Sequence, residues 1–489
     1  MKIASTTAGA LVASFLALSI PGSPPDPGDG PVRGQSFVWN QDSLWIALES
    51  QYVAARDSDC DEISESVVAR SLNLQSATQE LRHSPYEYDH SIFDSLETAF
   101  FDLAPAVAAC PDHLPDFVAT YREIRDGIKH QSRDWDVNTI GARQRLYRSL
   151  YGGRAAVEEV MLQHSDEMVT LVEGRAEPSA TPSVEINGLQ IHSGDILVSR
   201  GGYPTSALIS RGNDYPGNFS HIALVHVDGS TRQASIIEAH IEVGVTVATA
   251  EQYLQDKKLR IMVLRPRADL PALIEDPMLP HRAATLALEG ALGGHIPYDF
   301  EMDYNDPSRL FCSEVASAAY GEVGVTLWMG LSTISSDGLR RWLSAFGVRH
   351  FETQEPSDLE YDPQLAVVAE WRDPETLFKD HIDNAVIDVM LEGAERGDDL
   401  DFEWYRLAPA RIAKAYSWLR NQAGGTGPIP EGMSPAAALR NKSFSDRHDT
   451  IAATVYRDAT RFRSEQGYPP PYWKLIELSR LAVAGGGDG

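Results

Sequence analysis

Basic residues and cysteines are scarce in this chain of 489 residues. Lysine and arginine number 42 against 70 aspartates and glutamates, which gives a net charge of −28 at pH 7. Because nucleic acid phosphates bind basic faces, this balance argues against a nucleic acid partner. It also argues against binding to anionic lipid by overall charge alone. We interpret the acidic surface as one that keeps the protein soluble.

The usual metal and nucleotide motifs are missing as well. The sequence has no C-x-x-C, no H-E-x-x-H and no paired ligand spacing, so we expect no metal site and no cofactor. Its Gly-Gly pairs lack the spacing of dinucleotide-binding or Walker loops. Of the three cysteines, Cys60 and Cys110 are a candidate disulfide in an oxidising compartment, which would leave Cys312 as a free thiol.

The first residues are typical of an export signal. Lys2 precedes an apolar run from Ala4 to Ile20, and Ala17-Leu18-Ser19 offers small residues at the positions that a signal peptidase reads. The prediction is a signal peptide over 1–22 and a disordered Pro/Gly linker over 23–36, with the protein exported to the periplasm or cell envelope. An uncleaved anchor is the alternative, although about 17 residues is short for a bilayer span.

Periodicity divides the remainder into three parts. Apolar residues at helical spacing predict an N-terminal helical domain over 37–173 and a C-terminal helical region over 374–484, where Ile412, Tyr416 and Leu419 form one stripe. Between them, a domain over 183–373 has short strand-like runs, at 195–198, 221–227, 236–241, 261–264 and 365–371. Helical patterns occur there at 284–292 and 309–320. This pattern predicts an α+β fold in which a small sheet packs on a cysteine-bearing helix.

The central domain contains the residues for thiol acyl-transfer chemistry. Cys312 falls in the first turn of the predicted helix, which starts near Ser308 or Arg309, and a helix N-terminus favours the thiolate. His221 begins a strand on an apolar face and is the candidate base, directed at that helix. A carboxylate in the apolar run I-I-E-A needs a partner, and Glu238 would find one in His221. Strand alternation places His240 and Glu242 on the same face as Glu238, so the spacing does not decide which of the three would orient His221.

The motifs, taken in order, resemble one family. G-D-I-L-V, S-H-I-A-L-V, I-I-E-A, Y-D-F and F-C-S-E-V are similar to the circularly permuted papain-like amidases, the YiiX/YaeF-like branch of the NlpC-type cysteine peptidases. The resemblance implies a permuted papain-like core between the two helical flanks. It implies Cys312 as nucleophile, His221 as base and Glu238 as third polar residue. Residues matching the Y-D and G-D elements are candidates for substrate binding or support: Tyr298, Asp299 and Asp195.

The resemblance also implies an activity. We expect an exported cysteine hydrolase that cleaves an amide through a thioester, with a peptidoglycan stem-peptide bond as the first choice. A lipid amide or ester hydrolase or acyltransferase on the same triad is the alternative. A non-catalytic envelope scaffold is another, in which the helical flanks bind a protein partner. The polar insert from Arg200 to Phe219 is interpreted as either a lid over the substrate or surface filler.

Overall fold

The computed structural model describes residues 14–22, 34–39 and 41–485. Most of the predicted signal peptide (1–22) and linker (23–36) therefore lies outside the described residues, which include only 14–22 and 34–36 of them. Among the helices of the described ranges, none is both long and apolar enough to cross a membrane.

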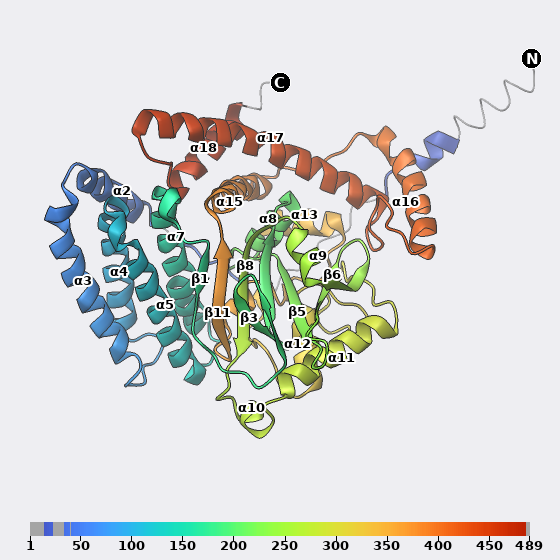
Figure 1. Cartoon of the computed structure of the whole chain (residues 1–489). Helices are drawn as coiled ribbons and strands as arrows, with labels where there is room; N and C mark the ends of the chain where they lie inside the picture. Colours follow the sequence, from blue (N-terminus) through green and yellow to red (C-terminus); the bar gives the residue numbers. More distant parts are fainter. Residues whose placement is uncertain (1–13, 23–33, 40, 486–489) are drawn as a thin grey trace, which may run out of the picture.

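The N-terminal part is a stack of helices, as the helical spacing predicts (Figure 1). The predicted stripes face inward: Leu96, Phe100 and Phe117 are buried, and the two phenylalanine rings stack with centroids 4.4 Å apart. A π-helical turn at Tyr147–Gly152 precedes the last long helix. The helices are α2 (Asp42–Arg56), α3 (Cys60–Glu80), α4 (Ser91–Ala109), α5 (Leu114–Gln131), α6 (Ile140–Leu146) and α7 (Gly153–Gln163).

A disulfide ties two of these helices together. It joins Cys60 at the start of α3 to Cys110 at the end of α4, with Cα atoms 5.5 Å apart and a sequence separation of 50. Closing a loop of that length removes conformational entropy from the unfolded chain worth about 4 kcal/mol.

We expect Cys60→Ser/Cys110→Ser to lower the free energy of unfolding by about 2 to 4 kcal/mol, measured by urea denaturation without reductant. Reduced wild-type protein is the matched control, and equal stability of the oxidised protein and the variant would contradict the expectation.

An antiparallel sheet of seven strands forms the centre, in the order β1-β11-β8-β4-β5-β6-β7. Ser199 pairs with His221 across β4 and β5, and Ala223 pairs with Glu238 across β5 and β6. The predicted α+β fold, with an antiparallel sheet between helical flanks, is confirmed. The sheet strands are β1 (Leu171–Glu173), β4 (Ile196–Gly201), β5 (His221–Val227), β6 (Ala234–His240), β7 (Gly244–Thr249), β8 (Lys258–Pro266) and β11 (Leu365–Arg372).

The two faces of the sheet have different covers. Ile222 and Leu224 pack in the same core as Val315 and Ala316 of α12 (Glu314–Glu322), and α11 (Leu279–Gly293) lies on this face too. The alternate side chains of β5, beginning with Ala223, pack with the hairpin β2 (Ser183–Ile186) and β3 (Leu189–His192) and with α9 (Ala250–Gln255). Short elements complete this domain: α10 (Pro271–Glu275), β9 (Ser332–Thr333), α13 (Asp337–Phe346), β10 (Glu352–Thr353) and α14 (Asp358–Tyr361).

The C-terminal helices stack over one end of the sheet (Figure 1). They are α15 (Pro374–Glu395), α16 (Leu407–Gln422), α17 (Pro435–Gln466) and α18 (Tyr472–Gly485). The insert from Arg200 to Phe219 packs beneath them, and its interpretation as a lid or surface filler is wrong. It contains α8 (Pro204–Arg211), whose Ala207 and Leu208 are buried in the core that α15 and α17 also form. Arg211 Nε lies 2.8 Å from Asp388 Oδ1 of α15.

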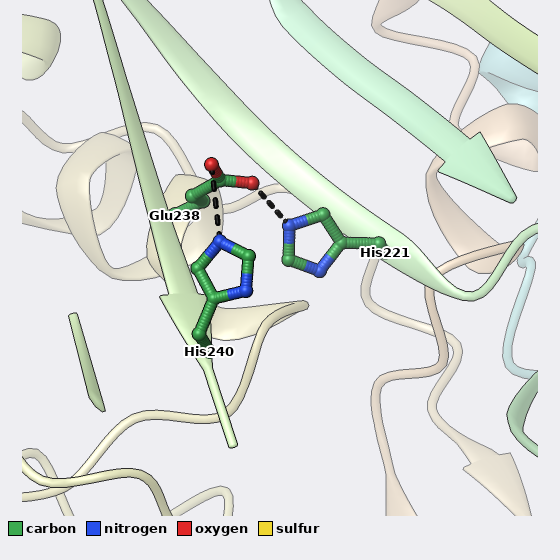
Figure 2. Close-up of side chains that lie close together, drawn as sticks. All are labelled: His221, Glu238 and His240. Atoms are coloured by element: carbon green, nitrogen blue, oxygen red, sulfur yellow. Dashed lines mark hydrogen bonds and ion pairs between the residues drawn. The ribbon is translucent and has the colours of Figure 1, made fainter. Parts of the chain in front are cut away.

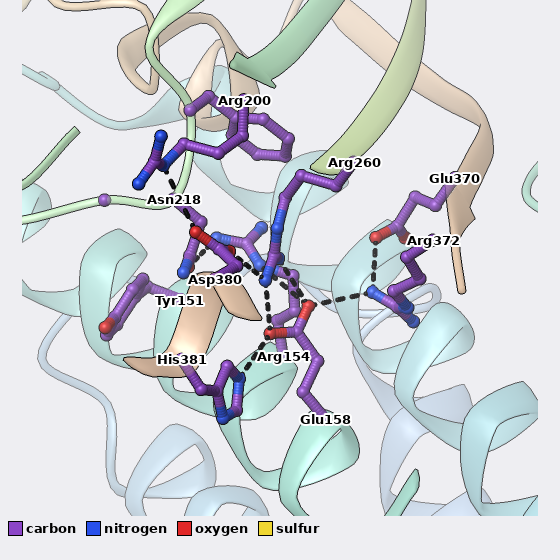
Figure 3. A network of polar contacts seen from close by, with 12 residues as sticks. Tyr151, Arg154, Glu158, Arg200, Asn218, Arg260, Glu370, Arg372, Asp380 and His381 are labelled. Atoms are coloured by element: carbon purple, nitrogen blue, oxygen red, sulfur yellow. Dashed lines mark hydrogen bonds and ion pairs between the residues drawn. The ribbon is translucent and has the colours of Figure 1, made fainter. Parts of the chain in front are cut away.

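A buried network of charges joins the flanks to the sheet (Figure 3). Glu158 of α7, 1% exposed, lies 2.6 Å from Arg260 of β8 and 3.0 Å from Arg372 of β11. Arg260 also lies 2.6 Å from Asp380 of α15. Although burial disfavours the charge of Glu158, Arg260 and the other cations hold its pKa well below its ordinary value. These ion pairs cross both predicted domain boundaries, at 173 and 374, which stay predictions.

Candidate active site

His221 and Glu238 form a hydrogen-bonded pair on neighbouring strands (Figure 2). The register that pairs Ala223 with Glu238 brings the first residue of β5 beside the carboxylate. His221 Nε2 lies 2.6 Å from Glu238 Oε2, with the imidazole 14% and the carboxylate 4% exposed. The apolar surroundings of Glu238 indicate that it needs a partner, and the structure places His221 in that position.

A second imidazole shares the carboxylate. His240 Nε2 lies 3.1 Å from Glu238 Oε1, so the carboxylate lies between two rings (Figure 2). Although burial disfavours the charge of Glu238, these contacts hold its pKa well below the usual value. Burial lowers the pKa of His221, against the opposing effect of Glu238. For His240 the carboxylate outweighs burial and the pKa is raised. Of the three residues that the spacing left open, Glu238 is the one that shares a hydrogen bond with His221.

Cys312 lies just before a helix and not in its first turn. The predicted start near Ser308 or Arg309 is wrong, because α12 begins at Glu314 with Ser313 as N-cap. Leu310 is held in extended conformation instead: its amide donates to Pro297 O at 3.1 Å, and its carbonyl accepts from Asp299 N at 3.2 Å. The amides that precede a helix have no partner within it, so the thiol still lies at the electropositive end of α12.

The thiol lies against the start of the histidine strand. Cys312 Sγ is 3.7 Å from the carbonyl oxygen of Ser220, the residue before His221, and it also interacts with the amide of Ile222. The imidazole does not point at α12 as predicted, since strand alternation places it on the face of Ala223, opposite the helix. The thiol therefore contacts the backbone of the strand at residues 220–222.

The environment of the thiol favours its neutral form. Burial raises the pKa of Cys312 to about 12, and the carboxyl of Glu355 acts in the same direction. Cys312 is 4% exposed, and burial also raises the pKa of Glu355 well above its usual value. The thiol is therefore neutral at rest, and a base would be required for it to act as a nucleophile.

The Y-D residues shape the approach to the thiol. Burial raises the pKa of the Tyr298 hydroxyl well above its usual value, and Cys312 raises it further, which places this hydroxyl beside the thiol. Asp299 is fully buried and accepts from the amides of Glu301 at 3.0 Å and Asp303 at 2.6 Å. The structure thus brings Tyr298 to the thiol, while Asp299 fixes the turn that carries it.

Asp195 lies away from this group. Since Ser199 pairs with His221, Asp195 lies beyond the opposite end of β4. Its carboxylate lies 2.7 Å from Arg265 Nη2 and accepts from the amide of His192 at 2.8 Å. Asp195 therefore supports the opening turn of the sheet and does not contact the thiol or the imidazole.

Sequence reasoning missed Glu355 and the double use of Glu238. Glu355 follows β10 in the run T-Q-E-P, whose composition contains no signal for a buried carboxyl near a thiol. The second contact of Glu238 was predictable, because His240 was on the same predicted face. His221, Glu238 and His240 also offer ligand atoms within 4.8 Å of one another, a donor set that suits Zn²⁺. No metal was predicted, and an ion bound there would occupy the imidazole of His221, the candidate base.

A family model matches the central part of the chain. Residues 190–369 match a family model described as "Permuted papain-like amidase enzyme, YaeF/YiiX, C92 family". This segment is similar to the permuted papain-like amidases. The resemblance that the motifs predict is confirmed for this amidase-like segment, and so is the prediction of a cysteine amidase or peptidase.

One solved structure is similar to the amidase-like segment. It is the crystal structure titled metalloprotein yiiX from Escherichia coli O157:H7, with 20% identity over 37% of this chain and 97% of that chain, and a TM-score of 0.30. No curated protein matches the chain.

Proposed function

We propose that the protein is an exported cysteine amidase in which Cys312 is the nucleophile, His221 the general base and Glu238 the residue that orients the base. The observation that supports this most is the 2.6 Å contact between His221 Nε2 and Glu238, next to the residue whose carbonyl contacts the thiol. Because Nε2 faces the carboxylate, Nδ1 is the nitrogen available to accept the thiol proton.

The reaction begins when the thiol turns from the Ser220 carbonyl toward Nδ1 of His221. Catalytic hydrogen bonds are often long before substrate binds and tighten in the complex. Sulfur bonds to the amide carbon as its proton passes to Nδ1, and the amides at the start of α12 stabilise the oxyanion. The C–N bond then breaks, and the imidazolium protonates the leaving amine. Water, deprotonated by His221, hydrolyses the thioester and regenerates the thiol.

The substrate we propose is a peptide amide of the peptidoglycan stem. The predicted export signal and the similarity to amidases support this choice. The test uses a soluble disaccharide-tetrapeptide as the probe, with release of a new amino group followed by mass spectrometry. Acid quenching during turnover should trap an acyl group on the tryptic peptide that contains Cys312. If this probe releases no amine but an N-acyl lipid does, the proposed substrate would be wrong and the proposed chemistry would stand. No acyl adduct with any amide or ester would overturn the enzyme proposal.

The pH dependence should identify the orienting residue. Because burial lowers the pKa of His221 from 6.5, we expect kcat/KM to rise with pH through one ionisation below 6.5. Glu238 raises that pKa, so Glu238→Gln should move this limb to lower pH and reduce the plateau at least about tenfold. Glu242→Gln is the matched control. Glu242 lies in the turn after β6, so this variant should leave the position of the limb and the height of the plateau unchanged. A profile shifted equally by both variants would contradict the role of Glu238.

A further inference from the structure

Helix α16 and the turn before it expose large apolar side chains to solvent. Three of them follow one stripe: Ile412 is 64%, Tyr416 50% and Leu419 60% exposed. Trp418, at 60%, lies next to this stripe. The turn adds Trp404 at 52% and Tyr405 at 46%. Single exposed apolar residues need no explanation, but a group of six in one segment marks an interaction surface.

The inner face of α16 explains why these side chains point outward. Small residues occupy that face: Ala410 packs with Ile429, Met433 and Ala437, and Ala413 lies against the same group. The Ser417 hydroxyl accepts from the amide of Ile429 at 2.9 Å. The helix therefore packs through small residues, and its largest apolar side chains remain uncovered by the described part of the chain.

The charge of this segment is opposite to that of the whole protein. From Trp404 to Gln422 the sequence contains four basic residues and no acidic one, in a chain of net charge −28. The basic residues are Arg406, Arg411, Lys414 and Arg420. A helix with exposed Trp, Tyr, Ile and Leu together with Arg and Lys has the composition of segments that lie in a membrane interface. Overall charge disfavours anionic lipid here, so only a local basic segment could bind it.

We propose that α16 with the turn 404–406, the α16 surface, docks on an anionic lipid bilayer. Its apolar stripe would enter the headgroup boundary while Arg406 and Arg420 meet lipid phosphates. The other two cations are bonded within the chain, since Arg411 donates to the carbonyl of Leu18 and Lys414 to that of Pro430. The chain next to it is consistent with this orientation: Arg411 donates to the carbonyls of Leu18 at 2.7 Å and Ile20 at 3.0 Å. The short helix at 14–18, part of the predicted signal segment, thus lies beside α16 (Figure 1). In the uncleaved chain, the exposed apolar residues of that segment extend the same surface.

The α16 surface is linked to the candidate active site through its inner face. Phe300, which follows Tyr298 and Asp299, packs with Ala410 and Met433. His295 Nε2 lies 2.8 Å from Glu431 Oε2 in the loop between α16 and α17. A bilayer bound to α16 would therefore lie against the helix that packs on the loop carrying Tyr298 to Cys312. The docking proposal does not depend on which amide the enzyme cleaves.

The experiment reads the environment of α16 directly in the full-length chain. An environment-sensitive NBD group is attached at Ala415→Cys, an exposed position on α16, in a Cys312→Ala background that keeps the Cys60–Cys110 disulfide. Vesicles with 30% phosphatidylglycerol, about the anionic content of a charged leaflet, should shift its emission to the blue and increase it several-fold. Pure phosphatidylcholine should give a much weaker response. The same label at Leu72→Cys on α3 is the position control and should not respond.

Matched variants separate the apolar and basic contributions. Ile412→Ser/Leu419→Ser should raise the lipid concentration for half-maximal signal at position 415 at least about tenfold. Val68→Ser/Leu72→Ser is the control, because these two residues are also exposed apolar side chains on one helix face, but on an acidic helix. Arg406→Gln/Arg420→Gln should weaken the response about 30-fold, since each cation contributes about fivefold. No blue shift at position 415, or equal shifts at 415 and 72, would overturn the proposal. A shift produced only by an added protein would assign the surface to a protein partner.

Discussion

Cys312→Ala should abolish turnover, with a loss in kcat/KM of at least about 10⁴-fold. In the proposed reaction the sulfur forms the bond to the amide carbon, and no acyl-enzyme can form without it. Other nucleophile–base pairs lose this much when the nucleophile is removed, because the remaining site only binds and polarises the substrate. Amine release from the disaccharide-tetrapeptide, followed over hours with excess enzyme, measures the loss.

The fold of this variant should be intact. Removing one small sulfur atom from a buried position should cost less than about 2 kcal/mol of unfolding free energy. Urea denaturation checks this, and Cys312→Ser gives a second variant with the same volume and a weaker nucleophile. His221→Ala should show a comparable loss, since the thiol of pKa about 12 needs a base. Activity that persists in Cys312→Ala at more than about a hundredth of wild type would contradict the thiol mechanism.

The sheet and the His–Glu pair were predictable because both follow from strand periodicity. A carboxylate in an apolar strand needs a partner, and antiparallel register limits the partner to a side chain on the same face of the next strand. His221 meets that condition. The choice between Glu238, His240 and Glu242 needed the distances, since alternation alone treats them equally.

The start of the cysteine helix could not be predicted from local sequence. Asn305, Pro307 and Ser308 are typical of a helix start, but Leu310 forms hydrogen bonds with Pro297 and Asp299 instead. This pairing is tertiary and overrides local preference. The prediction that His221 points toward the helix was wrong for a related reason. Periodicity gives the two faces of a strand but does not say which face a distant helix covers.

Two helices show a different limit of pattern reading. The insert 200–219 has a polar composition, yet α8 lies inside the protein because Arg211 has Asp388 as a partner. Conversely, the stripe of Ile412, Tyr416 and Leu419 predicts a helix correctly, but the stripe faces outward. An apolar stripe indicates that a face avoids water. It does not say whether the protein itself or another surface covers it.

The charges of the network in Figure 3 are separated by long stretches of sequence, and no local pattern could pair them.

Removing the Glu158 carboxylate from this network should have the second large effect. Glu158→Ala should lower the free energy of unfolding at pH 7 by about 3 to 5 kcal/mol, because Arg260 and Arg372 then remain buried without their shared carboxylate. Asp446→Ala is the matched control, since its ion pair with Lys442 is exposed, and it should cost less than about 1 kcal/mol.

The pH dependence of this loss tests its electrostatic origin. The pKa of Glu158 is lowered in the folded state, so its contribution is complete above the unfolded value of 4.5 and declines as pH falls toward the folded value. The difference between wild type and Glu158→Gln in urea denaturation should therefore be smaller at pH 3 than at pH 7. Gln keeps the volume of the side chain, so cavity formation contributes little to that difference. An equal loss at both pH values would contradict the electrostatic origin, and the ionised carboxylate of Glu158 would then not be what joins the flanks to the sheet.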